Sequence, residues 1–429
     1  MSMQSFALGM DNRVPDYKLR TEAGYLLRDA VNVDVTPQGT LKRRRGATLS
    51  AVTGTDTHSL WASDAGAFYA DGVTLNTVHA TALGIASVAV INHDSTNATI
   101  SKGSRLSYSD APEGGVYWTD GMKLERITDG VTAPIAPMLP AVLPKVTLLK
   151  WGEWDPFGPL VPGLREGLYT VLFTAIDGEG RESASTQPIQ LNARVNEGEF
   201  VIQIDYAGDI DVAVYVSEEG GTSPRFVGVI TTGGQLLINT QPDGRECPTY
   251  GMLPLPAGQI VRSFSGRTIV ASGSILYYSE PYAPGLYMAD SGFIPFPSRI
   301  TIVEPVQGAS QGLYVVSDNT YWLAGDFTQT NLTTSLPYGA VEGTSVIRYD
   351  QNIAHWMSVR GLVAAATGGD IKNLQEAHIA VSSAVTGATV VMDRNGVKQA
   401  VTSLFGSSPH QQAMASSYMD AEIINGATV

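Results

Sequence analysis

The sequence predicts an all-β protein with a propeller-like body and a sandwich inserted into it. Windows with apolar residues at helical spacing are scarce, whereas many short runs alternate apolar and polar residues with a period of two. Turn-forming residues are frequent, with 45 glycines and 23 prolines among 429 residues. An aromatic-rich hairpin also recurs along the chain, as it does in proteins built from repeated sheets. With 43% hydrophobic residues, the chain has enough apolar surface to bury several cores.

The first element is a hairpin in an N-terminal assembly segment, residues 1–50. Residues 30–35 alternate, so that three valines share one face of a strand and two polar residues share the other. Thr-Pro-Gln-Gly at 36–39 predicts a turn, because proline presets φ and glycine closes the turn. Residues 40–45 then form the second strand of the hairpin.

Four consecutive cations end this hairpin: Lys42, Arg43, Arg44 and Arg45. Three interpretations stay open for them: a solvated strand face, an ion-paired contact with an acidic neighbouring subunit, and direct contact with phosphate groups. We predict that they form an assembly contact, because they are the sharpest charge feature in a chain with only 16% charged residues.

The body is predicted in two parts, residues 51–150 and 255–405. Each repeat unit is an aromatic-rich strand, a tight turn with Ser, Asp, Asn or Gly, and a second strand. The copies lie at 68–75, 116–124, 268–278, 313–322 and 353–363. Apart from the long gap between the second and third copies, their spacing is roughly that of a four-stranded propeller blade. An ordinary pair of β-sandwiches with coincidental hairpins is the alternative.

A different segment fills the gap. A proline-rich stretch at 134–162 predicts a linker, and about seven short strands follow in residues 163–246. Residues 169–183 read Tyr-x-Val-x-Phe-x-x-x-Asp-x-x-Gly-x-Glu-Ser, which resembles immunoglobulin-like modules of the fibronectin type III kind. A second linker at 247–259 returns the chain to the repeat units. The resemblance implies a sandwich inserted into a surface loop of the body, where a long insertion costs little loop-closure entropy.

The first linker contains two aromatic and two acidic side chains close together: Trp151, Glu153, Trp154 and Asp155. We predict that they form a tip or pore loop. A sugar-binding tip, a loop that lines a pore and a loop that supports the sandwich are all open interpretations. At the other end of the chain, residues 406–429 form a polar C-terminal tail that either docks on a neighbouring subunit or frays.

No pattern in the sequence predicts catalysis, a metal or a cofactor. Gly308-x-Ser310-x-Gly312 matches a nucleophile elbow, which needs a following helix, but a strand pattern follows instead. The six histidines show no ligand spacing, and the single Cys247 can form neither an internal disulfide nor a cysteine-based zinc site. We therefore expect that the protein is not an enzyme.

An excess of acidic groups narrows the choice of partners. The chain has 27 Lys and Arg residues against 41 Asp and Glu residues, a net charge of −14. Such a chain does not bind nucleic acid by neutralising phosphates over its whole surface. No signal-peptide pattern opens the sequence, and the longest near-apolar run, at 81–91, is too short to span a bilayer. We expect synthesis in the cytoplasm and no membrane span.

Residues 27–46 resemble the opening of tail-hub and tail-nozzle proteins of short-tailed bacteriophages. The shared features are Asn32 in a short strand, Gly39 in the turn, and the Arg-x-Gly ending at Gly46. Those proteins carry propeller-like β domains, often with an inserted sandwich. The resemblance implies a structural virion protein that forms part of the DNA exit channel, retains packaged DNA and passes it at infection. It also implies a homo-oligomeric ring in the tail, commonly of six copies, beneath the portal and adaptor rings. Double-stranded DNA would pass through that ring without specific binding.

The acidic balance fits this role, because an anionic wall repels phosphates at short range and does not grip DNA. The alternative is a receptor- or glycan-binding propeller, with or without glycan cleavage, in a tail protein that touches the host surface. Clustered tryptophans beside paired carboxylates would favour that alternative. Four of the six tryptophans lie in or beside the repeat hairpins, where core packing explains them.

Overall fold

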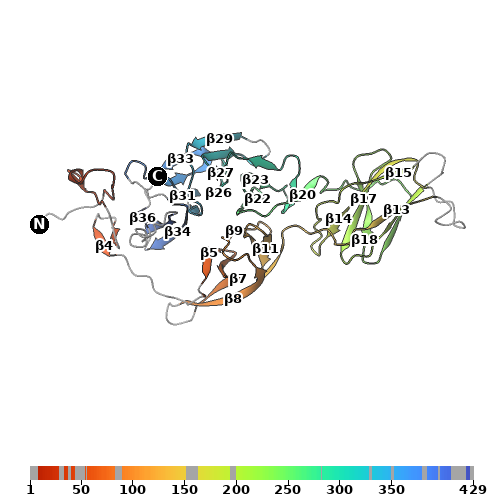
Figure 1. The fold of residues 1–429 in the computed structure, drawn as a ribbon, viewed down its shortest axis with the longest axis horizontal. Coiled ribbons are helices and arrows are strands. Elements are labelled where there is room, and N and C mark those ends of the chain that lie inside the picture. Colours follow the sequence, from red (N-terminus) through yellow and green to blue (C-terminus); the bar gives the residue numbers. More distant parts are fainter. Residues whose placement is uncertain are drawn as a thin grey trace.

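The computed structural model describes residues 8–28, 33–36, 40–43, 54, 56–82, 89–150, 163–193, 200–281, 283–327, 331–348, 352–378, 384–394, 397–406 and 422–425. The regular structure of these residues consists of strands and two short 3-10 turns, η1 (Asp16–Lys18) and η2 (Thr367–Gly369). The predicted all-β class is therefore confirmed. Figure 1 shows an elongated molecule, with stacked sheets in the middle and a separate group of strands, coloured yellow-green, at the end away from both termini.

Five four-stranded antiparallel sheets make up the body within the described part of the chain. The first sheet holds β5 (Thr57–Ser63), β6 (Gly66–Asp71), β7 (Thr74–Ala82) and β8 (Ala89–Thr99). The second holds β9 (Ser107–Asp110), β10 (Val116–Thr119), β11 (Leu124–Thr128) and β12 (Val131–Pro134). The third holds β21 (Ile260–Phe264), β22 (Arg267–Ser272), β23 (Ile275–Tyr278) and β25 (Phe293–Pro295). The fourth holds β26 (Ile302–Val306), β27 (Gly312–Val316), β28 (Thr320–Ala324) and β29 (Asn331–Leu336). The fifth holds β30 (Val346–Arg348), β31 (Ile353–Ser358), β32 (Gly361–Ala365) and β33 (Ile371–Asn373).

The five hairpins predicted from the repeat pattern are confirmed, and each supplies the two central strands of one of these sheets. The pairs are β6–β7, β10–β11, β22–β23, β27–β28 and β31–β32. Several of the central strands are buried on both faces and show continuous apolar runs; every residue of β10 and of β27 is buried. A run of apolar and aromatic residues bounded by turn residues is typical of such a strand, which explains why the sequence revealed these hairpins.

Successive sheets pack face to face and share one core between each pair. Along β10, Trp118 packs into the core between the first and second sheets, while Tyr117 packs into the core between the second and third. Along β27, Leu313 belongs to the core between the third and fourth sheets, and Tyr314 to the core between the fourth and fifth. Neighbouring residues on a strand point to opposite faces, so each middle sheet contributes to two cores.

Seven strands form a separate two-sheet unit, inserted in sequence between the second and third sheets of the body. One sheet pairs β13 (Lys145–Lys150), β16 (Phe200–Asp205) and β19 (Gln235–Ile238). The other pairs β15 (Ile189–Ala193), β14 (Gly167–Ile176), β17 (Asp211–Val216) and β18 (Arg225–Ile230). Both sheets contribute to one core, which includes Phe173, Phe200 and Val214.

The boundaries of this unit differ from those expected from the sequence. Residues 145–150 fall within the predicted first part of the body and inside the predicted linker, yet β13 pairs along its whole length with β16. The prolines on both sides of β13 suggested a linker, while its partner strand lies about fifty residues further along the chain. A local pattern does not reveal such a pairing.

Shorter strands complete the described structure. The predicted N-terminal hairpin is present as β3 (Val33–Val35) and β4 (Leu41–Arg43), preceded by β1 (Arg20–Thr21) and β2 (Gly24–Tyr25). In the second predicted linker, β20 (Met252–Pro254) pairs with β24 (Leu286–Met288). A three-stranded sheet of β34 (Thr386–Arg394), β35 (Val397–Phe405) and β36 (Glu422–Asn425) ends the chain, so part of the predicted tail pairs within this molecule.

Candidate functional site

The first strands of the first four sheets lie next to one another and are joined by polar side chains. Between β9 and β21, the Ser107 hydroxyl accepts a hydrogen bond from the Val261 amide at 3.1 Å, and the Ser109 hydroxyl donates to that of Ser263 at 3.2 Å. Between β5 and β9, Ser63 donates to the Asp110 carboxylate. We call this row of contacts the inner seam. It holds the sheets in register along one edge, where side-chain bonds take the place of a backbone ladder.

An ion pair between a partly buried arginine and a buried glutamate continues the inner seam from the third sheet to the fourth. Arg262 Nη2 of β21 lies 2.7 Å from Glu304 Oε1 of β26, and their side chains are only 20% and 4% exposed. The remaining donors of Arg262 reach the Ser107 hydroxyl at 3.0 Å and the Tyr108 carbonyl at 3.2 Å in the second sheet. One guanidinium therefore ties three sheets together, and its partly buried charge is both paired and hydrogen-bonded, as burial of a charge requires.

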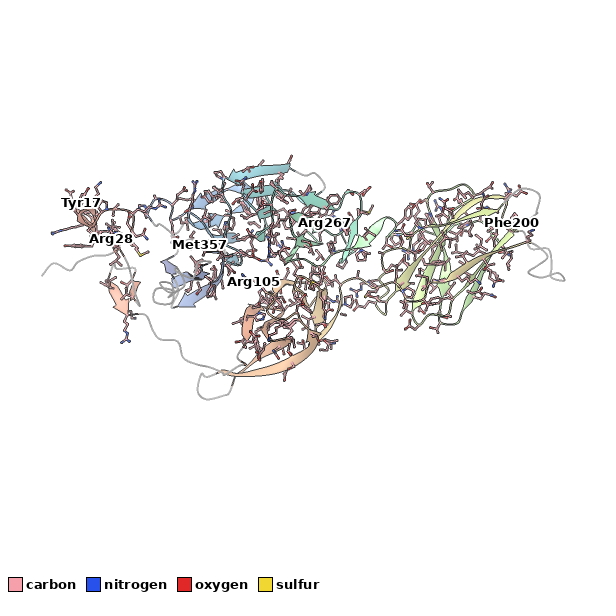
Figure 2. All side chains as sticks on the ribbon, viewed as in Figure 1. Tyr17, Arg28, Arg105, Phe200, Arg267 and Met357 are labelled. Atoms are coloured by element: carbon pink, nitrogen blue, oxygen red, sulfur yellow. The ribbon has the colours of Figure 1, made fainter. Side chains whose placement is uncertain are left out.

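Arg105 joins the early sheets to the end of the chain. It lies just before β9, and its guanidinium donates to the carbonyl oxygens of Glu342 at 3.3 Å, Gly343 at 2.9 Å and Gly387 at 3.1 Å. Gly343 has a φ of +83°, and a Cβ added there would overlap the guanidinium of Arg105. Figure 2 places Arg105 between the orange strands of the early sheets and the blue strands of the late ones. Residues more than 230 positions apart thus meet at one side chain.

The two-sheet unit is attached to the second sheet of the body through charged groups. Arg126 of β11 lies 3.5 Å from Glu113 and 3.3 Å from Glu179, which belongs to the loop after β14. In the same loop, Arg181 donates to the Ile135 carbonyl at 3.4 Å. The side chain of Arg126 is 14% exposed and that of Glu179 is 60% exposed, so the contact lies at the surface between the unit and the body and orients one against the other.

The motif that resembled a fibronectin type III module holds the turn after β14. Asp177 Oδ1 accepts hydrogen bonds from the amides of Glu179 at 3.0 Å and Arg181 at 2.9 Å. Although burial raises it, hydrogen bonds from Arg181 hold the pKa of Asp177 below its usual range. Glu182, at the end of the motif, accepts hydrogen bonds from the hydroxyls of Thr174 and Tyr215, both at 2.7 Å. The motif residues therefore organise the unit internally.

Cys247 and the Gly-x-Ser-x-Gly pattern lie in surroundings that do not favour catalysis. Cys247 is buried, and burial raises the pKa of its thiol, which disfavours the reactive thiolate. Gly308 and Ser310 lie in the connection from β26 to β27, and Gly312 begins β27, so a strand follows the Gly-x-Ser-x-Gly pattern. Among the described residues, no cluster of three His, Cys, Asp or Glu side chains could hold a metal ion. None of the helices described there has the length and apolar character needed to cross a membrane.

Only two of the predicted assembly residues fall in the described structure. Lys42 and Arg43 lie in β4, opposite Asp34 and Val33 of β3, and both are exposed. Arg44 and Arg45 lie outside the described residues. The predicted tip or pore loop, Trp151, Glu153, Trp154 and Asp155, lies outside them as well.

An N-terminal contact was missed by the sequence reasoning. Asp11 Oδ2 lies 3.0 Å from His378 Nδ1, and Asp11 Oδ1 accepts hydrogen bonds from the amides of Arg13 at 3.0 Å and Val14 at 3.1 Å. Burial raises the pKa of Asp11, but the bonds from His378 and the two amides outweigh it and lower the pKa below its usual range. The amide of Asn12 also donates to the His378 carbonyl at 3.1 Å. This contact fastens the N-terminal segment beside the fifth sheet.

Arg105, Arg262 and Glu304 were also missed. A sequence signal exists for Glu304, because a lone carboxylate within the apolar strand Ile302–Val306 indicates a buried, paired charge. No comparable signal marks the two arginines.

No family model matches the sequence, and no curated protein matches it.

Proposed function

We propose that the chain is a non-enzymatic structural subunit of a ring-shaped tail nozzle or hub in a short-tailed bacteriophage. In this proposal the body is a β-propeller and the two-sheet unit is an inserted sandwich of the immunoglobulin or fibronectin type III kind. The subunit forms part of the DNA exit channel, retains packaged DNA and passes it at infection. The observation that carries the proposal is the stack of five four-stranded sheets, interrupted once by a two-sheet unit.

The packing of the body supports a propeller. Each pair of successive sheets shares a core, and the first strands of four sheets meet along the inner seam. In propellers, sheets of four strands are repeated around a central axis with their first strands innermost. Arg105 joins the segment before the second sheet to Glu342, near the fifth sheet, and to Gly387 of β34, which is consistent with sheets that curve around a common axis.

The sequence features support a place in the tail. Residues 27–46 resemble the opening of nozzle and hub proteins, and the hairpin there exposes Lys42 and Arg43 for contact with a neighbour or with the ring above. A net charge of −14 on each copy repels the phosphates of passing DNA, so the duplex moves through without specific binding. Its partners are then other copies of the chain and the portal or adaptor ring.

Electron microscopy and mass measurement of the purified full-length chain test this function. The expected particle is a closed ring, commonly of six copies, with a central hole wide enough for a DNA duplex. Discrete monomers that bind or cleave glycans on an array would contradict the proposal and favour the receptor-binding alternative. Open filaments without a central hole would also contradict it.

A further inference from the structure

The outer edge of the fourth sheet lacks the features that usually protect an edge strand. β29 is the last strand in the order β26-β27-β28-β29, and no described strand pairs with its outer side. Its six residues, Asn-Leu-Thr-Thr-Ser-Leu, include neither proline nor a charged residue. The first four are exposed, with Leu332 at 40%. An exposed edge of this kind is a template for another strand.

The outer strands of three other sheets in the body are protected. β12 ends in Pro134, and its Thr132 amide is bonded to the Asn97 side chain at 2.8 Å. β25 ends in Pro295 and has three residues. β33 also has three residues and carries Lys372 at its centre. Proline, lysine and short length each discourage pairing with a further strand, so β29 is a more open acceptor than these three strands.

The N-terminal hairpin is a strand pair without a third strand among the described residues. β3 and β4 form a two-stranded sheet of three residues each. A two-stranded hairpin is marginally stable by itself and gains stability from a third strand or a packed face. Leu41 of β4 is 40% exposed, and Lys42 and Arg43 beside it are exposed. In Figure 1, β4 lies well away from β29 within one molecule.

We propose that the β3–β4 hairpin of one copy pairs with the β29 edge of a second copy, adding its strands to the fourth sheet. Strand addition of this kind uses backbone hydrogen bonds for affinity and side chains for specificity. This inference rests on the proposed ring and assigns the contact that builds it.

Charge complementarity supports a second copy as the occupant. Two acids lie in the turns next to the accepting strands: Asp318 just before β28, and Asp326 in the connection from β28 to β29. Asp318 is exposed, and a hydrogen bond from Ser317 lowers the pKa of its carboxyl, which is therefore ionised at neutral pH. Lys42 and Arg43 of β4, in the donor hairpin, have the opposite charge. Acids around the acceptor and cations on the donor favour a hairpin–edge contact over an edge–edge contact between two β29 strands.

The contact is heterologous, because the donor and acceptor surfaces differ. Each copy then offers a free hairpin in its N-terminal segment and a free edge on its fourth sheet. Such contacts form a closed ring where the rotation between copies closes, and an open filament where it does not.

Disulfide crosslinking between differently sized copies tests the contact. One full-length chain carries Lys42→Cys, and a second, enlarged by a tag, carries Thr334→Cys. Mild oxidation of the mixture is expected to give a crosslinked pair of mixed size, which reducing agent removes. Each variant alone gives no such pair, and this also controls for the buried Cys247. Absence of the mixed pair overturns the inference. A chain that carries both Lys42→Cys and Thr334→Cys also overturns it if its disulfide forms within one molecule.

A charge exchange tests the specificity. Arg43→Glu is expected to weaken association roughly tenfold, because reversal of an exposed charge removes one attraction and adds one repulsion. Thr334→Lys is expected to weaken it as well, whereas Thr334→Glu is tolerated. Combining Arg43→Glu with Thr334→Lys restores association. Thr232→Lys, at an exposed turn of the two-sheet unit, is the matched control and has no effect. Equal behaviour of the lysine and glutamate variants at 334 overturns the inference.

The outcomes separate this contact from the proposed function. Rings that form without the mixed crosslink overturn the contact and leave the nozzle proposal standing. Crosslinked copies that form open filaments support the contact and contradict the nozzle. A chain that stays monomeric at all concentrations contradicts both.

Discussion

The body and the two-sheet unit bury their apolar strands in different ways. In the two-sheet unit, strands of a single insertion close around one core. In the body, each sheet shares its cores with the sheets before and after it. The unit therefore holds its main core within itself, whereas a sheet of the body is stable only beside its neighbours. Polar contacts follow the same division: Glu182 bonds within the unit, while Arg262 and Arg105 bond across sheets of the body.

Glu304→Ala gives the largest expected effect and acts on the body alone. It leaves the largely buried Arg262 charge without its partner, which costs about 3 kcal/mol of unfolding free energy. Calorimetry of the full chain is expected to show a lower transition for the body and an unchanged transition for the two-sheet unit. The double variant Arg262→Met with Glu304→Leu loses less, because it removes both charges. A parallel drop of both transitions would show that the two parts do not unfold independently.

Arg126→Ala tests the junction between the two regions. It removes the cation shared by Glu113 and Glu179; because Glu179 is largely exposed, the loss costs only about 1 kcal/mol. We expect the unit to become mobile relative to the body, with a broader distribution of overall dimensions in small-angle X-ray scattering. Each part keeps its own strands, as measured by circular dichroism. Arg225→Ala, on a partly exposed pair inside the unit, is the matched control; an equal broadening there would refute the assigned role of Arg126.

Ile202→Val gives a small effect, confined to the two-sheet unit. Ile202 is fully buried in the shared core of its two sheets, and removal of one methylene costs about 0.5–1.5 kcal/mol. Ile269→Val in the core between the third and fourth sheets is the matched substitution in the body. Calorimetry should assign the first loss to the unit and the second to the body. The contrast between a self-contained and a shared core fails if either substitution shifts the other transition by as much.

Acidification tests the attachment of the N-terminal segment beside the fifth sheet. The pKa of Asp11 is lowered in the folded protein, so its contribution to stability is complete above the ordinary aspartate pKa and is lost as the pH falls through the lower folded value. Hydrogen exchange at the amides of Arg13 and Val14 should lose its protection over this acidic range. Asp11→Asn should remove the pH-dependent step. Persistence of the step in that variant would assign it to another group.

The predictable part of the fold is local. The hairpin β27–β28 is recognisable in the sequence from the continuous apolar run on each side of Ser-Asp-Asn. The candidate site was harder to predict. Lys42 and Arg43 were found as a run of cations, whereas Arg105 is one arginine among polar loop residues. Its partners, Gly343 and Gly387, lie far along the chain.

The amino-acid pattern therefore establishes the β class, the five central hairpins and the place of the insertion, because alternation and turn chemistry are properties of a few neighbouring residues. The folded chain alone decides that β13 joins the inserted unit, that successive sheets share cores, and that Arg262 meets Glu304. These features depend on which surfaces meet after the strands have formed. Burial and charge pairing select those contacts between residues far apart in the sequence, so the local hydrophobic pattern does not predict them.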